Sequence, residues 1–291
     1  MKKNILVIIN PKAGSSDAVT VSEIVKNRSK SLGLNTSFYY TTGKNDKQEI
    51  EQLIANNNFD RAIVAGGDGT INLVATIAVK YNIAIGILAC GSANGLAASL
   101  ELPQDINSQL EIAINNTVTS IDTLLINNNV CLHIADIGIN AELIYNYETS
   151  QSRGMTGYLK QTIPTLFKSK YPYHFSISSE EIETEKKGVL LAFANAKKYG
   201  TGAVINPEGS IMDGSFEIIL FKKLSLKAIA KSFLKDYSFS PTSVEIFKSR
   251  SVTVKSKTPI ALQVDGEYIG DFEKFTAQIK PNSLRIALPN R

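Results

Sequence analysis

The chain has 291 residues, of which 43% are hydrophobic and 20% are charged. This composition is typical of folded globular proteins and excludes an intrinsically disordered chain, and the length favours two domains. The 31 Lys and Arg residues and the 27 Asp and Glu residues give a net charge of +4, which is too small to indicate a nucleic-acid-binding protein.

Short apolar runs alternate with segments of helical length in the first part of the chain. Alternation of this kind implies a parallel sheet with helices on both of its faces. The predicted strands are residues 5–10, 36–40, 60–65 and 83–88. The predicted helices are residues 17–32, 45–57, 70–80, 93–101 and 106–115.

The pattern changes after residue 120, where apolar and β-branched runs follow one another with few helical segments between them. These runs predict strands at residues 120–126, 130–137, 172–178, 188–195, 214–221, 251–256, 259–264 and 283–288. We therefore expect an α/β domain over residues 1–125 and a mostly antiparallel β-rich domain over residues 126–291. The last strand is a candidate to return to the first domain.

Neither a membrane span nor a signal peptide is predicted. The longest uncharged stretch, residues 81–100, is interrupted by Gly, Ser and Asn and is too weakly hydrophobic to insert. The apolar run at residues 5–9 ends at Asn10 and is too short for a signal peptide. Cys90 and Cys131 are the only cysteines, which gives no disulfide framework and favours a reducing compartment. We expect a cytoplasmic protein.

Three of the predicted parallel strands end in loops that are rich in Gly, Ser, Thr and Asn. The carboxyl ends of parallel strands are where α/β sheets bind ligands. Small side chains and free backbone N–H groups can surround a phosphate chain there, beside helix N-termini that favour anions. The three loops are NPKAGSS at residues 10–16, GGDGTIN at 66–72 and GSANG at 91–95.

Asp68 lies inside the second of these loops, although a carboxylate repels phosphate unless a cation lies between them or the carboxylate accepts a proton. Metal-assisted phosphoryl transfer uses such a group. The alternative for GGDG alone is a tight strand-to-helix turn. The sequence contains none of the motifs of P-loop NTPases, protein kinases, α/β-hydrolases or zincins.

Five blocks of sequence stand out along the chain, namely NPKAG at 10–14, GGDGTIN at 66–72, GSANGLAASL at 91–100, NPEGSIMDG at 206–214 and VDGE at 264–267. In this order they resemble the diacylglycerol kinase catalytic-domain family of lipid kinases, which includes bacterial diacylglycerol kinases and sphingosine and ceramide kinases. The resemblance implies an N-terminal nucleotide-binding domain, a C-terminal β-rich domain and an active site in the cleft between them. It also implies transfer of the γ-phosphoryl group of ATP, with Mg²⁺, to a hydroxyl of a membrane lipid.

By the same resemblance, Glu267 falls on the proposed catalytic base, and Asp68 is the rival base or a magnesium contact. A carboxylate within hydrogen-bond reach of a lipid hydroxyl can take its proton during phosphoryl transfer. Taken alone, Asp265-Gly266 between two strands is a hairpin-turn signal. The implied nucleotide contacts are Asn10, Pro11, Lys12, Ala13, Gly14, Thr41, Gly66, Gly67, Asp68, Gly69, Thr70, Ile71, Asn72 and Ser92.

The resemblance also implies a structural Mg²⁺ at Ser210, Asp213 and Ser215, which match a loop that uses the Asp side chain and flanking backbone carbonyls. Oxygen ligands suit this ion, and the alternative is again a turn. Two residues depart from the bacterial pattern, since Gly95 replaces an Asp and Leu73 an acidic residue. The carboxylate missing at residue 95 would belong to a network that links the active site to this metal.

The third block, GSANGLAASL at 91–100, resembles the corresponding motif of sphingosine kinases. The substrate therefore stays open between a diacylglycerol-type lipid and a sphingoid base or ceramide. Residues 153–173 combine apolar side chains with the basic residues Arg153, Lys160, Lys168 and Lys170. A basic amphipathic segment of this kind is compatible with docking on an anionic membrane. The alternative is that the apolar side chains of this segment pack on the β-rich domain.

The expected partners are ATP, the lipid, the membrane surface and, as a candidate, a second copy of the chain in a homodimer. Two alternative functions remain open. An NAD kinase would share the GGDG loop and the two-domain organisation, and a nucleotide-binding regulator would have lost catalysis.

Overall fold

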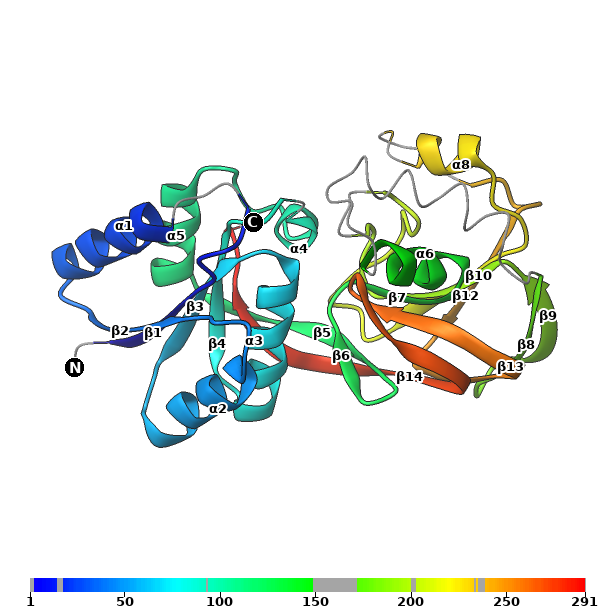
Figure 1. Ribbon diagram of the computed structural model, residues 1–291, viewed down its shortest axis with the longest axis horizontal. Coiled ribbons are helices and arrows are strands. Elements are labelled where there is room, and N and C mark those ends of the chain that lie inside the picture. Colours follow the sequence, from blue (N-terminus) through cyan, green and yellow to red (C-terminus); the bar gives the residue numbers. More distant parts are fainter. Residues whose placement is uncertain are drawn as a thin grey trace. The chain divides into compact units, whose positions relative to one another are not determined.

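The computed structural model of the chain describes residues 3–14, 18–92, 94–148, 172–199, 203–232, 234 and 239–290 (Figure 1). The chain divides into two compact units. The first comprises Met1–Ile121 and Asn282–Arg291, and the second is Asp122–Pro281. The expected boundary near residue 125 lies in β5, the same strand in which the chain passes from one unit to the other.

The first unit is an α/β domain built on a parallel sheet, which confirms the predicted fold of this part of the chain. Its strands lie in the order β4-β3-β1-β2, and the end of β14 pairs with β4 in parallel, Ile286 with Ile85. The elements are β1 (Asn4–Ile9), α1 (Ala18–Ser31), β2 (Asn35–Tyr40), α2 (Asp46–Asn56), β3 (Arg61–Gly66), α3 (Asp68–Tyr81), β4 (Ala84–Ala89), α4 (Gly95–Ser99) and α5 (Ile106–Asn115).

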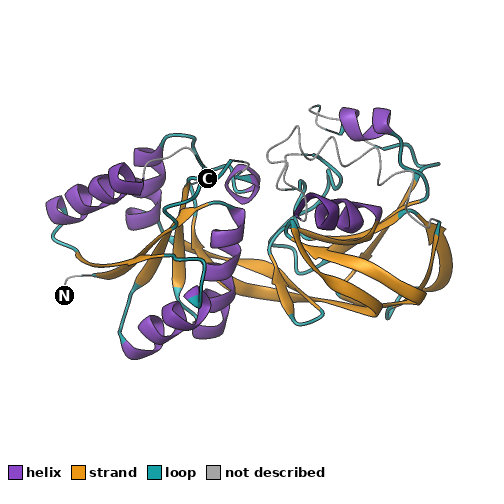
Figure 2. Ribbon diagram, in the orientation of Figure 1, coloured by secondary structure: helices purple, strands orange, loops and turns teal. Residues whose placement is uncertain are grey.

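Helices cover both sides of this sheet (Figure 2). The apolar run of β1 is buried on both faces, as is usual in parallel sheets, and therefore shows no alternation of polar and apolar residues. One face packs with α1 and α5 in a single apolar cluster, whose members include Ile5, Val7, Ile9, Val25, Leu110 and Ile114. This rigid packing holds the ends of the strands, and the loops that follow them, at one edge of the sheet.

The second unit is mostly antiparallel β-structure, as predicted. Its main strand order is β12-β11-β10-β7-β13-β14, and β8 with β9 forms a hairpin that extends from β13. The elements are β5 (Val118–Ile126), β6 (Asn129–Cys131), β7 (Ile134–Gly138), α6 (Ile139–Glu148), β8 (Tyr173–Ser178), β9 (Glu183–Gly188), β10 (Leu190–Ala194), β11 (Phe216–Phe221), α8 (Leu226–Lys231), β12 (Val244–Ser249), β13 (Ser251–Val264) and β14 (Glu267–Ala287).

Several elements of the second unit differ from the predicted ones or are missing from the prediction. Within the described part of the chain, β9 (sequence ETEKKG) pairs with β8 alone, and its exposed charged side chains leave no apolar pattern that would predict a strand. β13 is one strand where two are predicted, because the interruption is a register shift between Lys255 and Ile260. β14 is predicted only at its end, residues 283–288, since most side chains of its first half are exposed or half-buried. The helices α6 and α8 and the strand β12 are also absent from the prediction.

Two sequence expectations concern the membrane, namely that no segment spans it and that residues 153–173 dock on its surface. Among the described residues, no helix is both long and apolar enough to cross a membrane. The basic and apolar segment with Arg153, Lys160, Lys168 and Lys170 lies outside the described residues.

Candidate active site

The three glycine loops of the first unit contact one another at the carboxyl ends of β1, β3 and β4. The side-chain amide of Asn10 donates a hydrogen bond to the hydroxyl of Thr70, with an N···O distance of 2.9 Å. A Cβ added at Gly91 would lie 2.5 Å from the Cα of Gly67, so these loops leave no room for a side chain. The structure thus brings the predicted nucleotide-binding residues of all three loops together.

Asn10 fixes the shape of the first loop. Its backbone N–H donates to the carbonyl of Ala65 at the end of β3, at 2.9 Å. Its side-chain Oδ1 accepts the backbone N–H of Lys12, also at 2.9 Å. Thr41, another predicted contact, follows β2 and donates its backbone N–H to the carbonyl of Ile9. Pro11 and Lys12 are exposed, so the loop presents a positive charge to solvent.

Gly14 ends the described part of this loop in a left-handed conformation, with φ +57°. A Cβ there would overlap the carbonyl oxygen of Cys90, the residue before the third loop. Ala13, by contrast, has a buried side chain in the apolar cluster of the sheet. Only glycine therefore fits residue 14, for reasons both of backbone conformation and of space.

We expect Gly14→Ala to destabilise the protein and to weaken ATP binding. The left-handed backbone costs an alanine about 1–2 kcal/mol, and overlap with Cys90 adds about 1–3 kcal/mol. Gly33→Ala is the matched control, because Gly33 has φ +64° but a Cβ added there would meet no atom of the other described residues within 4 Å. Urea unfolding and ATP titration of both variants measure the difference. Equal losses of stability, with ATP binding intact in both variants, would contradict a loop contact at Gly14.

The second loop leads directly into α3. Gly66 is buried, and a Cβ on it would lie 2.7 Å from the Cβ of Thr70. The carbonyl of Gly67 accepts the backbone N–H of Ile71 at 3.0 Å, which begins the helix. The Ile71 side chain is fully buried, so only its backbone remains for a nucleotide contact. Gly69 is exposed, and Asn72 is half-buried.

Asp68 links the second loop to the third. Its Oδ2 accepts the backbone N–H of Gly95 at 2.9 Å, and its Oδ1 accepts that of Leu96 at 3.0 Å. Both bonds satisfy free N–H groups at the start of α4. Gly95 therefore contributes through its backbone where the bacterial pattern has an Asp. Each oxygen of Asp68 keeps a further lone pair for a cation or a proton.

The third loop is closed by Asn94, which has a left-handed φ of 53°. Its Oδ1 accepts the N–H of Gly91 at 2.7 Å, and its Nδ2 donates to the carbonyl of the same residue at 2.8 Å. The two bonds hold Gly91 against Gly67. Ser92 is exposed on this loop.

Glu267 begins β14 in the second unit and is exposed. The two residues before it form a tight turn, with φ 50° at Asp265 and 92° at Gly266. Positive φ values at both central residues are the mark of a type I′ hairpin, which the Asp-Gly pair predicts. The Asp265 carboxylate accepts the backbone N–H groups of Leu132 and His133 at 2.7 and 2.8 Å. This turn is thereby fixed to the start of β7.

A buried polar network supports the same turn. The Gln263 side chain accepts the N–H of Gly266 at 2.8 Å and donates to Oδ2 of Asp136 at 2.6 Å. Tyr199 and Asn140 also donate to that oxygen, each at 2.7 Å. No motif in the sequence identifies Asp136 or Gln263. Their roles follow only from the pairing of β7 with β13.

Burial raises the pKa of Asp136 from 3.8 to about 6, although hydrogen bonds from Tyr199, Asn140 and Gln263 favour the charged form. Between these two values the folded protein holds a proton that the unfolded chain has released. The free energy of unfolding must therefore fall as pH rises from 4 to above 6. A shift of this size corresponds to about 3 kcal/mol.

We expect Asp136→Asn to remove this part of the pH dependence, because an amide does not titrate. Urea unfolding from pH 4 to pH 7 measures it. The variant should gain stability relative to the unsubstituted chain as the pH rises. Parallel stability curves for the two proteins would show that the Asp136 carboxyl does not titrate in this range.

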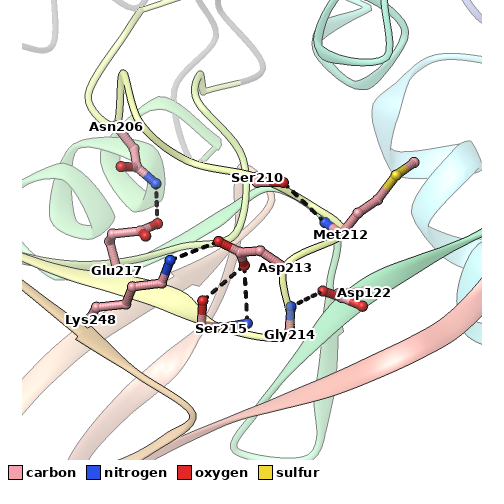
Figure 3. Close-up of polar contacts among 9 residues, drawn as sticks. All are labelled: Asp122, Asn206, Ser210, Met212, Asp213, Gly214, Ser215, Glu217 and Lys248. Carbon is pink, nitrogen blue, oxygen red and sulfur yellow. Dashed lines mark hydrogen bonds and ion pairs between the residues drawn. The ribbon is translucent and has the colours of Figure 1, made fainter. Parts of the chain in front are cut away.

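The predicted metal-binding loop lies in the second unit, and Figure 3 shows its contacts. Oδ1 of Asp213 accepts the hydroxyl and the backbone N–H of Ser215, at 2.8 and 3.1 Å. Oδ2 of Asp213 is 2.8 Å from Nζ of Lys248. The hydroxyl of Ser210 accepts the N–H of Met212 at 3.4 Å instead of facing Asp213.

Burial raises the pKa of Asp213, but the hydrogen bonds from Lys248 and Ser215 outweigh it and hold that pKa below its ordinary value. Both oxygens of the carboxylate are thus engaged by this chain's own donors. Among the described residues, no group of three or more His, Cys, Asp and Glu side chains could hold a metal ion. Unlike Asp68, whose donors are neutral backbone N–H groups, Asp213 has a cationic ammonium on Oδ2, and the loop as folded therefore does not fit a divalent metal ion on this carboxylate.

Two family models match the chain. The model described as the diacylglycerol kinase catalytic domain matches residues 4–126. The model described as the YegS C-terminal NAD kinase beta sandwich-like domain matches residues 137–288, more than half of the chain.

Two relatives named diacylglycerol kinase match this chain along more than nine-tenths of their own length. A diacylglycerol kinase of Staphylococcus saprophyticus is 28% identical over 303 residues, covering 100% of this chain and 97% of the relative. One of Bacillus subtilis is 27% identical, covering 92% of this chain and 91% of the relative. A crystal structure of a diacylglycerol kinase from Bacillus anthracis has the same fold, with a TM-score of 0.76, 18% identity and coverage of 99% and 97% of the two chains. The chain therefore belongs to the diacylglycerol kinase catalytic-domain family of lipid kinases, as its five sequence blocks predict.

Proposed function

We propose that this chain is an ATP-dependent lipid kinase that transfers the γ-phosphoryl group of ATP to a hydroxyl of a membrane lipid. The observation that carries the proposal is the contact of the three glycine loops around Asp68, in a member of a lipid kinase family. Loops of small residues at the ends of parallel strands suit a triphosphate, because they offer backbone N–H groups without steric hindrance.

In this proposal the nucleotide lies on the loops that contain Asn10, Gly67 and Ser92. The exposed Lys12 adds a positive charge beside the phosphates. Asp68 is the only carboxylate in the three loops, and its free lone pairs fit a cation held together with ATP. A Mg²⁺ ion held there by Asp68 and the nucleotide would neutralise the phosphate oxygens.

Glu267 is proposed as the base. Its carboxylate takes the proton of the lipid hydroxyl, the hydroxyl oxygen forms a bond to the γ-phosphorus, and the bond from that phosphorus to ADP breaks. The Asp265-Gly266 turn, fixed by hydrogen bonds to Leu132, His133 and Gln263, limits the freedom of the backbone that carries Glu267. Asp68 remains the rival base.

The lipid is proposed from two observations that point in different directions. Relatives named diacylglycerol kinase favour a diacylglycerol-type substrate. The GSANGLAASL block favours a sphingoid base or ceramide. A cytoplasmic enzyme that binds an anionic membrane peripherally, through residues 153–173, remains the proposed setting, with a homodimer as a candidate assembly.

The test is transfer of labelled γ-phosphate from ATP with Mg²⁺ into mixed micelles that contain diacylglycerol, sphingosine or ceramide. NAD serves as a soluble control substrate. Label in one lipid supports the proposal and identifies the substrate class. Label in NAD alone, or tight ATP binding without any transfer, contradicts the proposal and supports an NAD kinase or a regulator, respectively.

A further inference from the structure

The loop at residues 210–215 is folded around a carboxylate whose two oxygens are both engaged within the chain. Asp213 accepts two hydrogen bonds from Ser215 on Oδ1 and the ammonium of Lys248 on Oδ2 (Figure 3). Mg²⁺ requires several oxygen ligands at about 2.1 Å in octahedral geometry. An ammonium 2.8 Å from Oδ2 blocks one of these positions and repels a second cation.

Lys248 reaches this loop because of the sheet register. It lies on β12 directly opposite Glu217 of β11. Glu217 is buried and accepts the side-chain N–H of Asn206 at 2.6 Å. The Lys248 ammonium therefore faces negative charge from both Asp213 and Glu217. It supplies a positive charge at the point where the family resemblance implies a metal ion.

Two backbone groups next to Asp213 are hydrogen-bonded to Asp122. The N–H of Gly214 donates to the buried carboxylate of Asp122 at 2.7 Å. The carbonyl of Ile211 accepts the N–H of Asp122 at 2.7 Å and is therefore already hydrogen-bonded. Gly95 carries no side chain, so the carboxylate that would link such a metal to the active site is absent as well.

We propose that Lys248 is the resident cation of the 210–215 loop and takes the place of a divalent metal ion in this chain. The ion pair is half-exposed, with 59% of the Lys248 side chain and 31% of the Asp213 side chain accessible. A pair so exposed contributes little to stability on its own. What the pair supplies is charge balance for Asp213, so the loop does not need a divalent ion to neutralise this carboxylate.

The test measures thermal unfolding of the nucleotide-free protein in EDTA and in increasing Mg²⁺, so it does not depend on kinase activity. The unsubstituted chain should show no Mg²⁺-dependent change in Tm. Lys248→Met frees Oδ2 of Asp213 and should create a Mg²⁺-dependent rise, about 2–4 °C at ten times the dissociation constant. The double variant Lys248→Met, Asp213→Asn should lose this rise.

Lys186→Met is the matched control, because it removes another half-exposed lysine of an ion pair, 2.9 Å from Glu245. Glu245 keeps a second lysine, Lys222, so this variant should show no response to Mg²⁺. Two outcomes would overturn the proposal. One is a Mg²⁺-dependent rise in the unsubstituted chain that Asp213→Asn removes. The other is a Lys248→Met variant whose Tm does not respond to Mg²⁺.

Discussion

Glu267→Gln is expected to lower the rate of phosphoryl transfer by about two to four orders of magnitude, the usual contribution of a general base. Gln has nearly the same shape as Glu but cannot accept the proton of the substrate hydroxyl. Residue 267 is exposed and its backbone pairs with Val264, so the fold should not depend on the side-chain charge. The free energy of unfolding should change by less than about 0.5 kcal/mol.

Turnover with saturating ATP and lipid, together with urea unfolding, measures both expectations. Glu273→Gln is the matched control, because Glu273 is an exposed glutamate of the same strand, β14. It should leave turnover unchanged. If Glu267→Gln keeps the original rate, or if the two variants lose activity equally, Glu267 is not the base.

Asp68→Asn is expected to lower both turnover and stability, which distinguishes it from Glu267→Gln. Asp68 accepts the N–H groups of Gly95 and Leu96 on its two oxygens. Asn offers one oxygen and turns an NH₂ group toward the other donor, so one partly buried hydrogen bond is lost. The cost is about 1–3 kcal/mol of unfolding free energy. Loss of the carboxylate near the phosphates should also weaken the dependence of turnover on Mg²⁺.

Asp105→Asn serves as the control for the structural part of this effect. Asp105 caps α5 by accepting the N–H of Ser108 at 2.8 Å, outside the glycine loops. Asn is nearly as good a helix cap as Asp, so this variant should keep both its stability and its activity. An Asp68→Asn variant that is destabilised but fully active would assign Asp68 a structural role alone.

Local sequence was a sufficient guide to the parallel sheet and its loops. The strands β1, β3 and β4 are continuous apolar runs because both of their faces are buried, and the loops after them contain glycines that no other residue can replace. Strand β9 could not be found in this way. It forms one strand of the β8–β9 hairpin, and its side chains are charged and largely exposed. The sequence therefore shows no alternation of apolar residues that would predict a strand there.

The sequence by itself determined the fold class, the family and the loops that form the candidate nucleotide site, since each depends on residues that are close together in the chain. Only the tertiary structure paired Lys248 with Asp213 and Gln263 with Asp136. These partners lie 35 and 127 residues apart, and the register of the sheets brings them together. A metal-loop motif therefore identified Asp213 but could not reveal that the cation beside this loop residue is a lysine of strand β12.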